Sequence, residues 1–254
     1  MFTAEVQFII PETVDDAESA IYNLLAPWQK NGQVLNSDWS FTQDENNYRT
    51  FLMIFREDSL HKKYDDKYAR KARRQLTKLA PNSPKITILG EDPFSAKICT
   101  CRKPAFYILF THFLSLESPI RCGDCFGPLP QYKMLPKQTE FHEGINFWRA
   151  TYKDCDSLQM GCTVGERFGT REISHHESSL SKLGLSICND ITAATKIGAY
   201  YYLYRGNGRS VTSEKKCKCP SCGGDWLLDE PLHCIFDFKC DRCRLLSNIG
   251  FSVR

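Results

Sequence analysis

Apolar and polar residues follow two different periods over the first part of the chain. Apolar side chains occupy every second position from 2 to 10, which is typical of a half-buried strand. A helical spacing replaces this pattern between residues 17 and 28, after a segment, 13–16, that resembles an N-terminal capping box. Two strand-like runs, 34–41 and 48–55, then flank a polar pentapeptide, and this arrangement predicts a hairpin.

A second helix pattern and a fourth strand complete this region. The helix pattern covers residues 59–79, and the strand pattern lies at 86–89, so that the order of elements is β-α-β-β-α-β. This order is typical of the split βαβ, or ferredoxin-like, arrangement. We therefore predict a ferredoxin-like domain over residues 1–92 and an α+β fold class for the whole chain.

The rest of the chain divides into three further regions. Residues 93–136 contain four cysteines and strand-like runs, and predict a small β module. Helical patterns dominate residues 137–205, which end in a Tyr-rich strand. A Gly-Asn-Gly turn then leads into residues 206–254, the predicted zinc ribbon.

Four cysteines in the last region have the spacing of a four-thiolate zinc site. Two Cys-x2-Cys pairs are separated by seventeen residues, and their members are Cys219, Cys222, Cys240 and Cys243. Each pair aims two sulfurs from one tight turn, so two turns together complete a tetrahedron. Cys217 is an alternative to Cys219, but its Cys-x-Cys spacing makes it the weaker choice. Four reduced, buried thiols are the other interpretation.

A second cysteine group is a candidate for another zinc ion. Cys99 and Cys101 precede Cys122 and Cys125 by twenty residues. Residues i and i+2 of a strand face the same way, so the Cys-x-Cys half can supply two ligands. Packed free thiols are the alternative. Redox chemistry at Cys122 and Cys125 is a weaker interpretation, because the Phe-Gly-Pro-Leu-Pro segment that follows does not predict the helix N-terminus that lowers a thiol pKa.

Composition favours metal ligation over disulfides. The chain of 254 residues has 13 cysteines, an odd number, and its start lacks the basic region and the small-residue cleavage site of a signal peptide. Its apolar stretches are all shorter than a membrane span. We therefore expect a cytoplasmic protein with reduced thiols, one or two Zn²⁺ ions and no membrane association. The net charge of +3 does not by itself indicate a nucleic-acid-binding protein.

Clustered cations nevertheless predict nucleic-acid contacts on three elements. The second helix is strongly basic and could neutralise several phosphates, although a solvated outer helix face would have the same pattern. Cations around the ribbon either contact phosphate or offset the charge of about −2 that four thiolates leave on Zn²⁺. Tyr200, Tyr202 and Tyr204 share one strand face, where they either stack on bases or pack against a neighbouring element. The predicted contact residues are Lys67, Arg70, Lys71, Arg73, Arg74, Lys78, Tyr202, Arg205, Lys218 and Arg242.

Three segments resemble an uncharacterised bacterial family. They are the segment with FYILFTHFLSLESPIRCGDCFGPLP, the stretch YYYLYRGNGR, and the terminal CPSCGG with CDRC. The family that they resemble is described as zinc-ribbon-containing, and nucleic-acid binding has been suggested for it on the basis of the ribbon. The resemblance extends over most of the chain. It implies a C-terminal zinc ribbon with the four ligands named above, and it implies no established activity.

Three classes of function remain open. A zinc-stabilised protein that associates with RNA or DNA through basic surfaces is the leading hypothesis. A non-catalytic protein-binding module, such as an adaptor or an immunity-type inhibitor of a toxin, would use the ribbon as a scaffold. A metal-dependent enzyme is the least favoured class, since the sequence has no His-Glu-x-x-His pair, phosphate-binding glycine loop or nucleophile elbow, and four thiolates close a zinc site.

Overall fold

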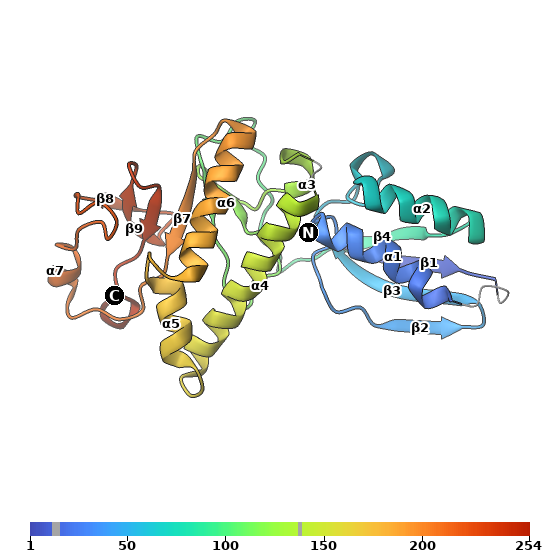
Figure 1. Cartoon of the computed structure of the whole chain (residues 1–254), viewed down its shortest axis with the longest axis horizontal. Helices are drawn as coiled ribbons and strands as arrows, with labels where there is room; N and C mark the ends of the chain where they lie inside the picture. Colours follow the sequence, from blue (N-terminus) through green and yellow to red (C-terminus); the bar gives the residue numbers. More distant parts are fainter. Residues whose placement is uncertain (12–15, 137–138) are drawn as a thin grey trace. The chain divides into compact units, whose positions relative to one another are not determined.

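The protein has a mixed α+β structure with two β-sheets, which confirms the predicted fold class (Figure 1). The computed structural model describes residues 1–11, 16–136 and 139–254. The chain divides into two compact units, and each contains one of the sheets. The first unit comprises Met1–Ile98, Leu116–Ser118 and Pro130–Asn146, and the second comprises Cys99–Ser115, Pro119–Leu129 and Phe147–Arg254.

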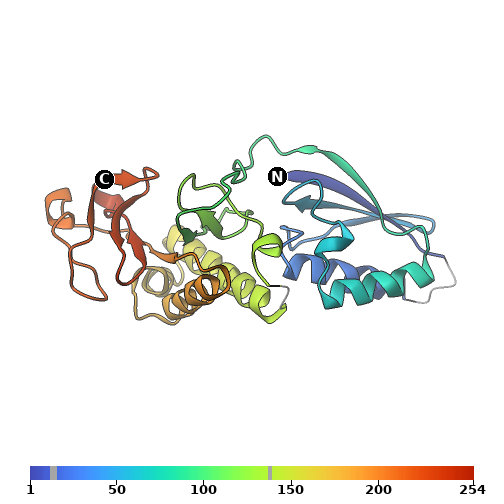
Figure 2. The same cartoon turned by 90° about the horizontal axis from the view of Figure 1, so that it is seen from above.

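The first unit is built on a four-stranded sheet. The strands lie in the order β2-β3-β1-β4, and every neighbouring pair is antiparallel. Helices α1 and α2 cover the same face of this sheet (Figure 2). The elements of the unit are β1 (Phe2–Ile9), α1 (Ala17–Lys30), β2 (Phe41–Asp44), β3 (Asn47–Ile54), the 3-10 helix η1 (Lys62–Tyr64), α2 (Lys67–Leu79), β4 (Lys85–Glu91) and α3 (Gln131–Met134).

Alternation along the strands directs one row of apolar side chains toward the helices. On β1, Val6 and Phe8 are fully buried, whereas Gln7 between them is not. Helix α1 contributes Leu24 and Trp28 to the same core, and β3 contributes Leu52. Burial of one such large apolar side chain stabilises the fold by about 1.5 to 3 kcal/mol.

Two elements of the first unit begin later than predicted, and side-chain hydrogen bonds explain both differences. The first hairpin strand begins at Phe41 and not at 34, because Asn36 Oδ1 accepts the N–H of Met53 (2.9 Å) and interrupts the backbone ladder. Helix α2 begins at Lys67 and not at 59, because Asp66 caps it. The predicted capping residues 13–15 lie outside the described residues.

The second unit is built on a six-stranded mixed sheet. The strand order is β6-β5-β7-β10-β9-β8. Strand β7 pairs in parallel with both β5 and β10, and the other neighbours are antiparallel. One sheet therefore joins the central region to the predicted ribbon. The remaining elements are β5 (Tyr107–Leu109), β6 (Ile120–Cys122), α4 (Thr139–Gly161), which belongs to this unit from Phe147 onward, α5 (Glu166–Ser174), α6 (Ser179–Thr195), β7 (Ala199–Leu203), α7 (Val211–Glu214), β8 (Leu227–Leu232), β9 (Phe236–Cys240), β10 (Leu245–Ser247) and the 3-10 helix η2 (Phe251–Val253).

Helices α4 and α6 pack on one face of this second sheet. The rings of Trp148 on α4 and Tyr201 on β7 are 6.0 Å apart. Gly184 allows α6 to approach β7 closely, because a Cβ at this position would lie 2.2 Å from the Tyr201 ring. Among the described residues, no helix combines the length and the apolar character needed to cross a membrane.

An aromatic cluster fills the opposite face of the second sheet. Tyr202 of β7 and Phe236 of β9 are both buried, with ring centroids 5.3 Å apart. Phe110 and Phe126, from the chain on either side of β6, complete the cluster at 5.2 Å from each other. The aromatic cluster thus holds the loop after β6 against strands that belong to the ribbon.

Candidate metal centres

The four predicted ribbon cysteines meet at one point of the second unit. Cys219 and Cys222 lie in the turn before β8, Cys240 ends β9, and Cys243 lies in the turn before β10. Their Sγ atoms all lie within 4.8 Å of one another, and those of Cys222 and Cys240 are 3.7 Å apart. A tetrahedral zinc ion with Zn–S bonds of about 2.3 Å places its sulfurs about 3.8 Å apart. The ribbon group therefore has the dimensions of a four-thiolate metal site.

Both cysteine turns of the ribbon group share one backbone signature. The residue after the second cysteine is left-handed in each case, with φ +69° at Gly223 and φ +52° at Arg244. This conformation costs about 1 kcal/mol for a residue with a side chain. The turns direct backbone N–H groups toward the cysteine sulfurs. The N–H of Gly224 points toward Cys222, and the N–H of Cys243 points toward Cys240.

The thiols of the ribbon group differ in how readily they ionise. The N–H of Gly224 lowers the pKa of Cys222 to about 7, whereas burial raises the pKa of Cys240 to about 12. Four thiolates at this separation repel one another, so that all four ionise only with a cation among them. Four soft sulfur donors in a tetrahedron fit Zn²⁺ and leave no open coordination position.

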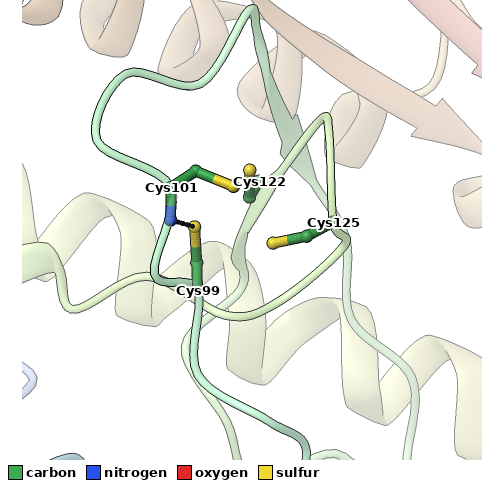
Figure 3. Close-up of side chains that lie close together, drawn as sticks. All are labelled: Cys99, Cys101, Cys122 and Cys125. Carbon is green, nitrogen blue, oxygen red and sulfur yellow. Dashed lines mark hydrogen bonds between the residues drawn. The ribbon is translucent and has the colours of Figure 1, made fainter.

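The second predicted group also comes together. Figure 3 shows Cys99, Cys101, Cys122 and Cys125 around a common centre, and their Sγ atoms all lie within 4.8 Å of one another. The two Cys-x-Cys residues do not belong to a strand, contrary to the prediction. They lie in an irregular segment instead, in which the N–H of Cys101 donates to Cys99 Sγ (3.4 Å). Two four-cysteine groups that could hold metal ions are therefore present.

The Cys122–Cys125 turn repeats the signature of the ribbon turns. Phe126, which follows the second cysteine, has φ +59°, and the N–H of Asp124 donates to Cys122 Sγ (3.4 Å). Gly123 cannot carry a side chain here, because a Cβ would lie 2.6 Å from the Phe106 ring. The Cys122–Cys125 turn therefore has the backbone geometry that presents two thiolates to a metal ion. It also lacks the helix N-terminus that a redox pair needs, since no helix of the described chain begins between Cys125 and Pro130.

Cys217 does not join the ribbon group. Its thiol lies beside other partners: Arg205 Nη2 donates to its sulfur (3.4 Å), and the sulfur lies 3.7 Å from the carbonyl oxygen of Ser213. The geometry therefore favours Cys219 over Cys217 as the fourth member of the ribbon group.

The predicted cations of α2 separate into an exposed set and one structural residue. Arg73 Nε donates to Asp65 Oδ2 (2.6 Å) and its Nη2 donates to the carbonyl of Leu60 (3.0 Å). Its guanidinium also lies 5.0 Å from the Trp28 ring centre. We therefore leave Arg73 out of any proposed contact surface. The other five cations surround a shallow hollow of about 460 Å³, and they are Lys67, Arg70, Lys71, Arg74 and Lys78.

The remaining predicted contact residues all belong to the second unit. Tyr202 is only 4% exposed, and its hydroxyl donates to Asn248 Oδ1 (2.8 Å), so its ring is not presented to a base. Arg205 pairs with Glu214, and Lys218 pairs with Asp225. Arg242 is exposed. The structure thus gathers the α2 cations on one helix of the first unit, whereas Tyr202, Arg205, Lys218 and Arg242 all belong to the second unit.

Sequence reasoning missed one residue that contacts the central group. The Nε2–H of His233, in the turn between β8 and β9, donates to the carbonyl oxygen of Gly123 (2.7 Å). A carbonyl oxygen can only accept, so the geometry assigns the proton to Nε2. No spacing rule links His233 to Gly123, which lies 110 positions earlier in the chain. The one available signal is the turn itself, which carries His-Cys between two apolar strands.

Comparisons with known proteins place the chain among uncharacterised relatives. Three family models match successive parts of it: a domain of unknown function (DUF8589) at residues 1–90, a second (DUF2310) at 101–204 and a third (DUF8594) at 208–253. An uncharacterized protein of Haemophilus influenzae is 34% identical over 242 residues, which is 93% of each chain. Another from the same organism is 41% identical over 165 residues, 65% of this chain and 81% of its own length.

No solved structure matches the chain. The predicted resemblance to an uncharacterised bacterial family is confirmed in part: the matching family models and the bacterial relatives are all uncharacterised. The descriptions of these families mention neither a zinc ribbon nor nucleic acid. The geometry of the two cysteine groups is therefore what supports metal binding.

Proposed function

We propose that this chain, which belongs to the same family as the Haemophilus influenzae proteins and carries the DUF2310 domain, is a zinc-stabilised protein that associates with nucleic acid through helix α2. The observation that carries the proposal is the exposed basic face of α2. We place the protein in the reducing cytoplasm, where thiols remain available to metal ions.

Zinc is the metal that suits both cysteine groups best. Each group offers four sulfur donors and no oxygen or nitrogen donor. A tetrahedron of thiolates selects Zn²⁺ over the hard cations Mg²⁺ and Ca²⁺. It also leaves no position for a substrate or a reactive water. The role that we assign to both ions is therefore structural, with the second sheet as the element that they stabilise.

The basic face of α2 follows from helical spacing. Residues 67, 70, 71, 74 and 78 recur at intervals of three and four, so their side chains share one side of the helix. Within residues 1–11, 16–136 and 139–254, no carboxylate forms an ion pair with Lys71, Arg74 or Lys78. Uncompensated cations in a row attract a polyanion, and each phosphate that they neutralise releases bound counterions.

The groove beside this basic face adds groups that can contact bases or sugars. A hollow of about 610 Å³ lies between α1 and α2, and its lining includes Asn23, Tyr68, Lys71 and Gln75. Tyr68 is 47% exposed. An exposed ring and two amide side chains next to cations suit a ligand with both charged and aromatic parts. The β-α-β-β-α-β order and the strand order β2-β3-β1-β4 support our further proposal that this unit is ferredoxin-like.

Fluorescence anisotropy tests the proposal with labelled single-stranded and duplex RNA and DNA, each measured across a series of salt concentrations. The test variant replaces Lys71, Arg74 and Lys78 with alanine. The control variant replaces Arg167, Arg171 and Lys196, three exposed cations of the second unit, and so makes the same change in net charge.

The α2 variant is expected to bind at least about tenfold more weakly, and to reduce the salt dependence of binding by about two to three phosphate contacts. The control variant is expected to bind like the unaltered chain. Equal losses in both variants would mean that net charge alone drives association. No binding at low salt to any of the four nucleic acids would overturn the proposal.

A protein-binding function is the second candidate, and a specific observation favours it. Three apolar side chains around the turn between α4 and α5 are strongly exposed: Met160 at the end of α4 by 53%, Val164 in the turn by 80% and Phe168 in the first turn of α5 by 60%. Exposed apolar groups this close in the chain are typical of docking surfaces. Replacement of Val164 and Phe168 by serine should abolish binding to such a partner and leave nucleic-acid binding unchanged.

A further inference from the structure

The β8–β9 hairpin contacts both cysteine groups, one at each end. At its base, the hairpin follows Cys222 and ends at Cys240, two members of the ribbon group. At its tip, the turn between the strands lies against the central group, where His233 donates its Nε2–H to the carbonyl of Gly123 (2.7 Å). Gly123 is the residue after Cys122. The hairpin therefore connects the two groups directly.

The tip makes a second contact with the central turn. The His233 ring stacks on the Phe126 ring, with centroids 5.1 Å apart and an angle of 26° between the planes. Phe126 follows Cys125 and has the left-handed conformation that shapes this turn. His233 therefore contacts both Gly123, which follows Cys122, and Phe126, which follows Cys125. Both set the direction in which a ligand sulfur points.

The turn that presents His233 is strained. His233 has φ +53° and Cys234 has φ +57°, and the N–H of Ile235 closes the turn on the carbonyl of Leu232 (3.1 Å). A β-turn whose two central residues are left-handed favours Asn-Gly at these positions, whereas residues with larger side chains cost about 1 to 2 kcal/mol each. Asn-Gly would form this hairpin more readily. Retained strain of this kind points to a role beyond turn formation.

The base of the hairpin is fastened to the ribbon group. The N–H of Lys239 donates to the carbonyl of Trp226 (2.7 Å), and the rings of Trp226 and Phe238 stack at 5.0 Å. The N–H of Cys219 donates to the carbonyl of Gly224 (2.9 Å) within the first ribbon turn. Order in the ribbon group is therefore transmitted to the strands that carry the tip.

We infer that the β8–β9 hairpin couples the metal affinities of the two cysteine groups, and that His233 is the positioning residue through which it acts. A metal ion in the ribbon group orders the base of the hairpin, the hairpin places its tip, and the tip holds the central turn in the geometry that binds metal. Thermodynamic linkage makes the effect reciprocal, so a metal ion in the central group strengthens binding in the ribbon group by the same factor. This inference rests on the proposal that both groups bind zinc.

Co²⁺ titration of the full chain under reducing, anaerobic conditions tests the coupling, because the charge-transfer absorption of cobalt thiolates reports occupancy directly. Two disabled chains give the affinity of each group alone. One carries Cys240→Ser with Cys243→Ser, and the other carries Cys122→Ser with Cys125→Ser. The unaltered chain is then compared with the sum of these two isotherms.

The key variant is His233→Asn. Asparagine tolerates the left-handed conformation better than histidine, so the hairpin keeps its turn, while the shorter side chain cannot span the distance to Gly123. His233→Gln serves as the conservative variant, because its amide N–H can still reach a carbonyl at this position. Weaker coupling in His233→Asn than in His233→Gln would show that the contact with Gly123, and not the stability of the turn, carries the coupling.

The unaltered chain is expected to bind two Co²⁺ ions about tenfold more tightly than the sum of the two separate groups, within the usual range of coupling between sites. In His233→Asn the isotherm should equal the sum, and in His233→Gln the coupling should be restored in part. Independent binding by the unaltered chain would overturn the coupling and leave the zinc proposal intact. Undiminished coupling in His233→Asn would exclude His233 as its carrier. If neither group bound Co²⁺, the zinc proposal itself would fail.

Discussion

Asp65 and Arg73 form a two-point ion pair, with 2.6 Å between Arg73 Nε and Asp65 Oδ2 and 3.2 Å between Nη2 and Oδ1. The Asp65 side chain is completely buried, and the Nε1–H of Trp28 also donates to it (3.0 Å). This pair gives Arg73 a role in the fold, whereas Arg74, the next residue, is exposed on the basic face of α2. Of these two neighbouring arginines, only Arg73 is therefore expected to affect stability, and only Arg74 the proposed binding.

Arg73→Ala is expected to destabilise the first unit by about 3 kcal/mol, since it leaves the Asp65 charge buried with only a neutral donor. Arg74→Ala should change the unfolding free energy by no more than about 0.5 kcal/mol. Urea unfolding followed by circular dichroism measures both. The same midpoint for the two variants would contradict the structural role of Arg73.

For the affinity for nucleic acid, the two variants should rank the other way round, with the larger loss in Arg74→Ala. At a temperature where both variants are folded, Arg74→Ala is expected to weaken binding to RNA or DNA about two- to fivefold and to reduce the salt dependence by about one phosphate contact. Arg73→Ala should bind like the unaltered chain. Anisotropy titrations at two salt concentrations measure both affinities. Weaker binding by Arg73→Ala would show that Arg73 also contributes to the contact surface.

Metal content gives a direct count of occupied groups. Native mass spectrometry of the purified chain is expected to show two zinc ions. Cys240→Ser and Cys122→Ser should each remove one ion. Cys162→Ser, at an exposed cysteine outside both groups, should retain two. Chelator treatment should lower the melting temperature of the second unit, because metal binding contributes to its folding free energy. One ion in the unaltered chain would restrict the assignment to a single group.

Gly184 and Gly144 form a matched pair for the packing of α6 against β7. A Cβ at Gly184 would lie 2.2 Å from the Tyr201 ring, whereas a Cβ at Gly144 meets nothing within 4 Å. Gly184→Ala is expected to cost about 2 kcal/mol through overpacking. Gly144→Ala, also in a helix, should stabilise the chain by up to about 1 kcal/mol through helix propensity. Thermal unfolding distinguishes the two, and a neutral Gly184→Ala would show that the Tyr201 ring can move aside.

The pKa of Asp58 should lie well below the ordinary value of an aspartate. Burial opposes its ionisation, but hydrogen bonds from Tyr64, Lys63 and Lys133 outweigh this effect and lower its pKa from 3.8 to about 2. Because the folded-state pKa is the lower one, Asp58 contributes stability above about pH 4, and this contribution is lost as the pH falls from about 4 to 2. Carboxyl ¹³C NMR of the folded chain measures the pKa directly. Tyr64→Phe should raise it, and an unchanged value would assign the shift to the two lysines.

Local patterns in the sequence were enough to predict both cysteine groups and much of the element order. Ligand spacing is a local property of each turn, and the two halves of a four-thiolate group have few alternative partners. Helical and strand periods likewise report on residues close in the chain, as along β1 and α1. The predicted starts of the first hairpin strand and of α2 were wrong, because a polar side chain, Asn36 or Asp66, forms a hydrogen bond that changes the backbone path there.

Long-range partners explain what the sequence did not reveal. Arg73 and Arg74 look alike in a basic run, and only the folded position of Asp65 distinguishes them. Tyr202 has the pattern of a displayed aromatic, yet the strands beside β7 and the aromatic cluster bury it. His233 lies far along the chain from the turn that it contacts. In each case a tertiary contact decides the role of the residue.

The parallel pairing of β7 with β10 determines how the chain can be divided. Leu245, Leu246 and Ser247 lie beside Tyr201, Tyr202 and Leu203 in register. A cut after Arg205 would leave β7 in one piece and β10 in the other, each with an unpaired strand edge lined by apolar side chains. Exposed edges of this kind pair with other chains. Separately expressed halves should therefore aggregate alone and recover solubility when they are produced together.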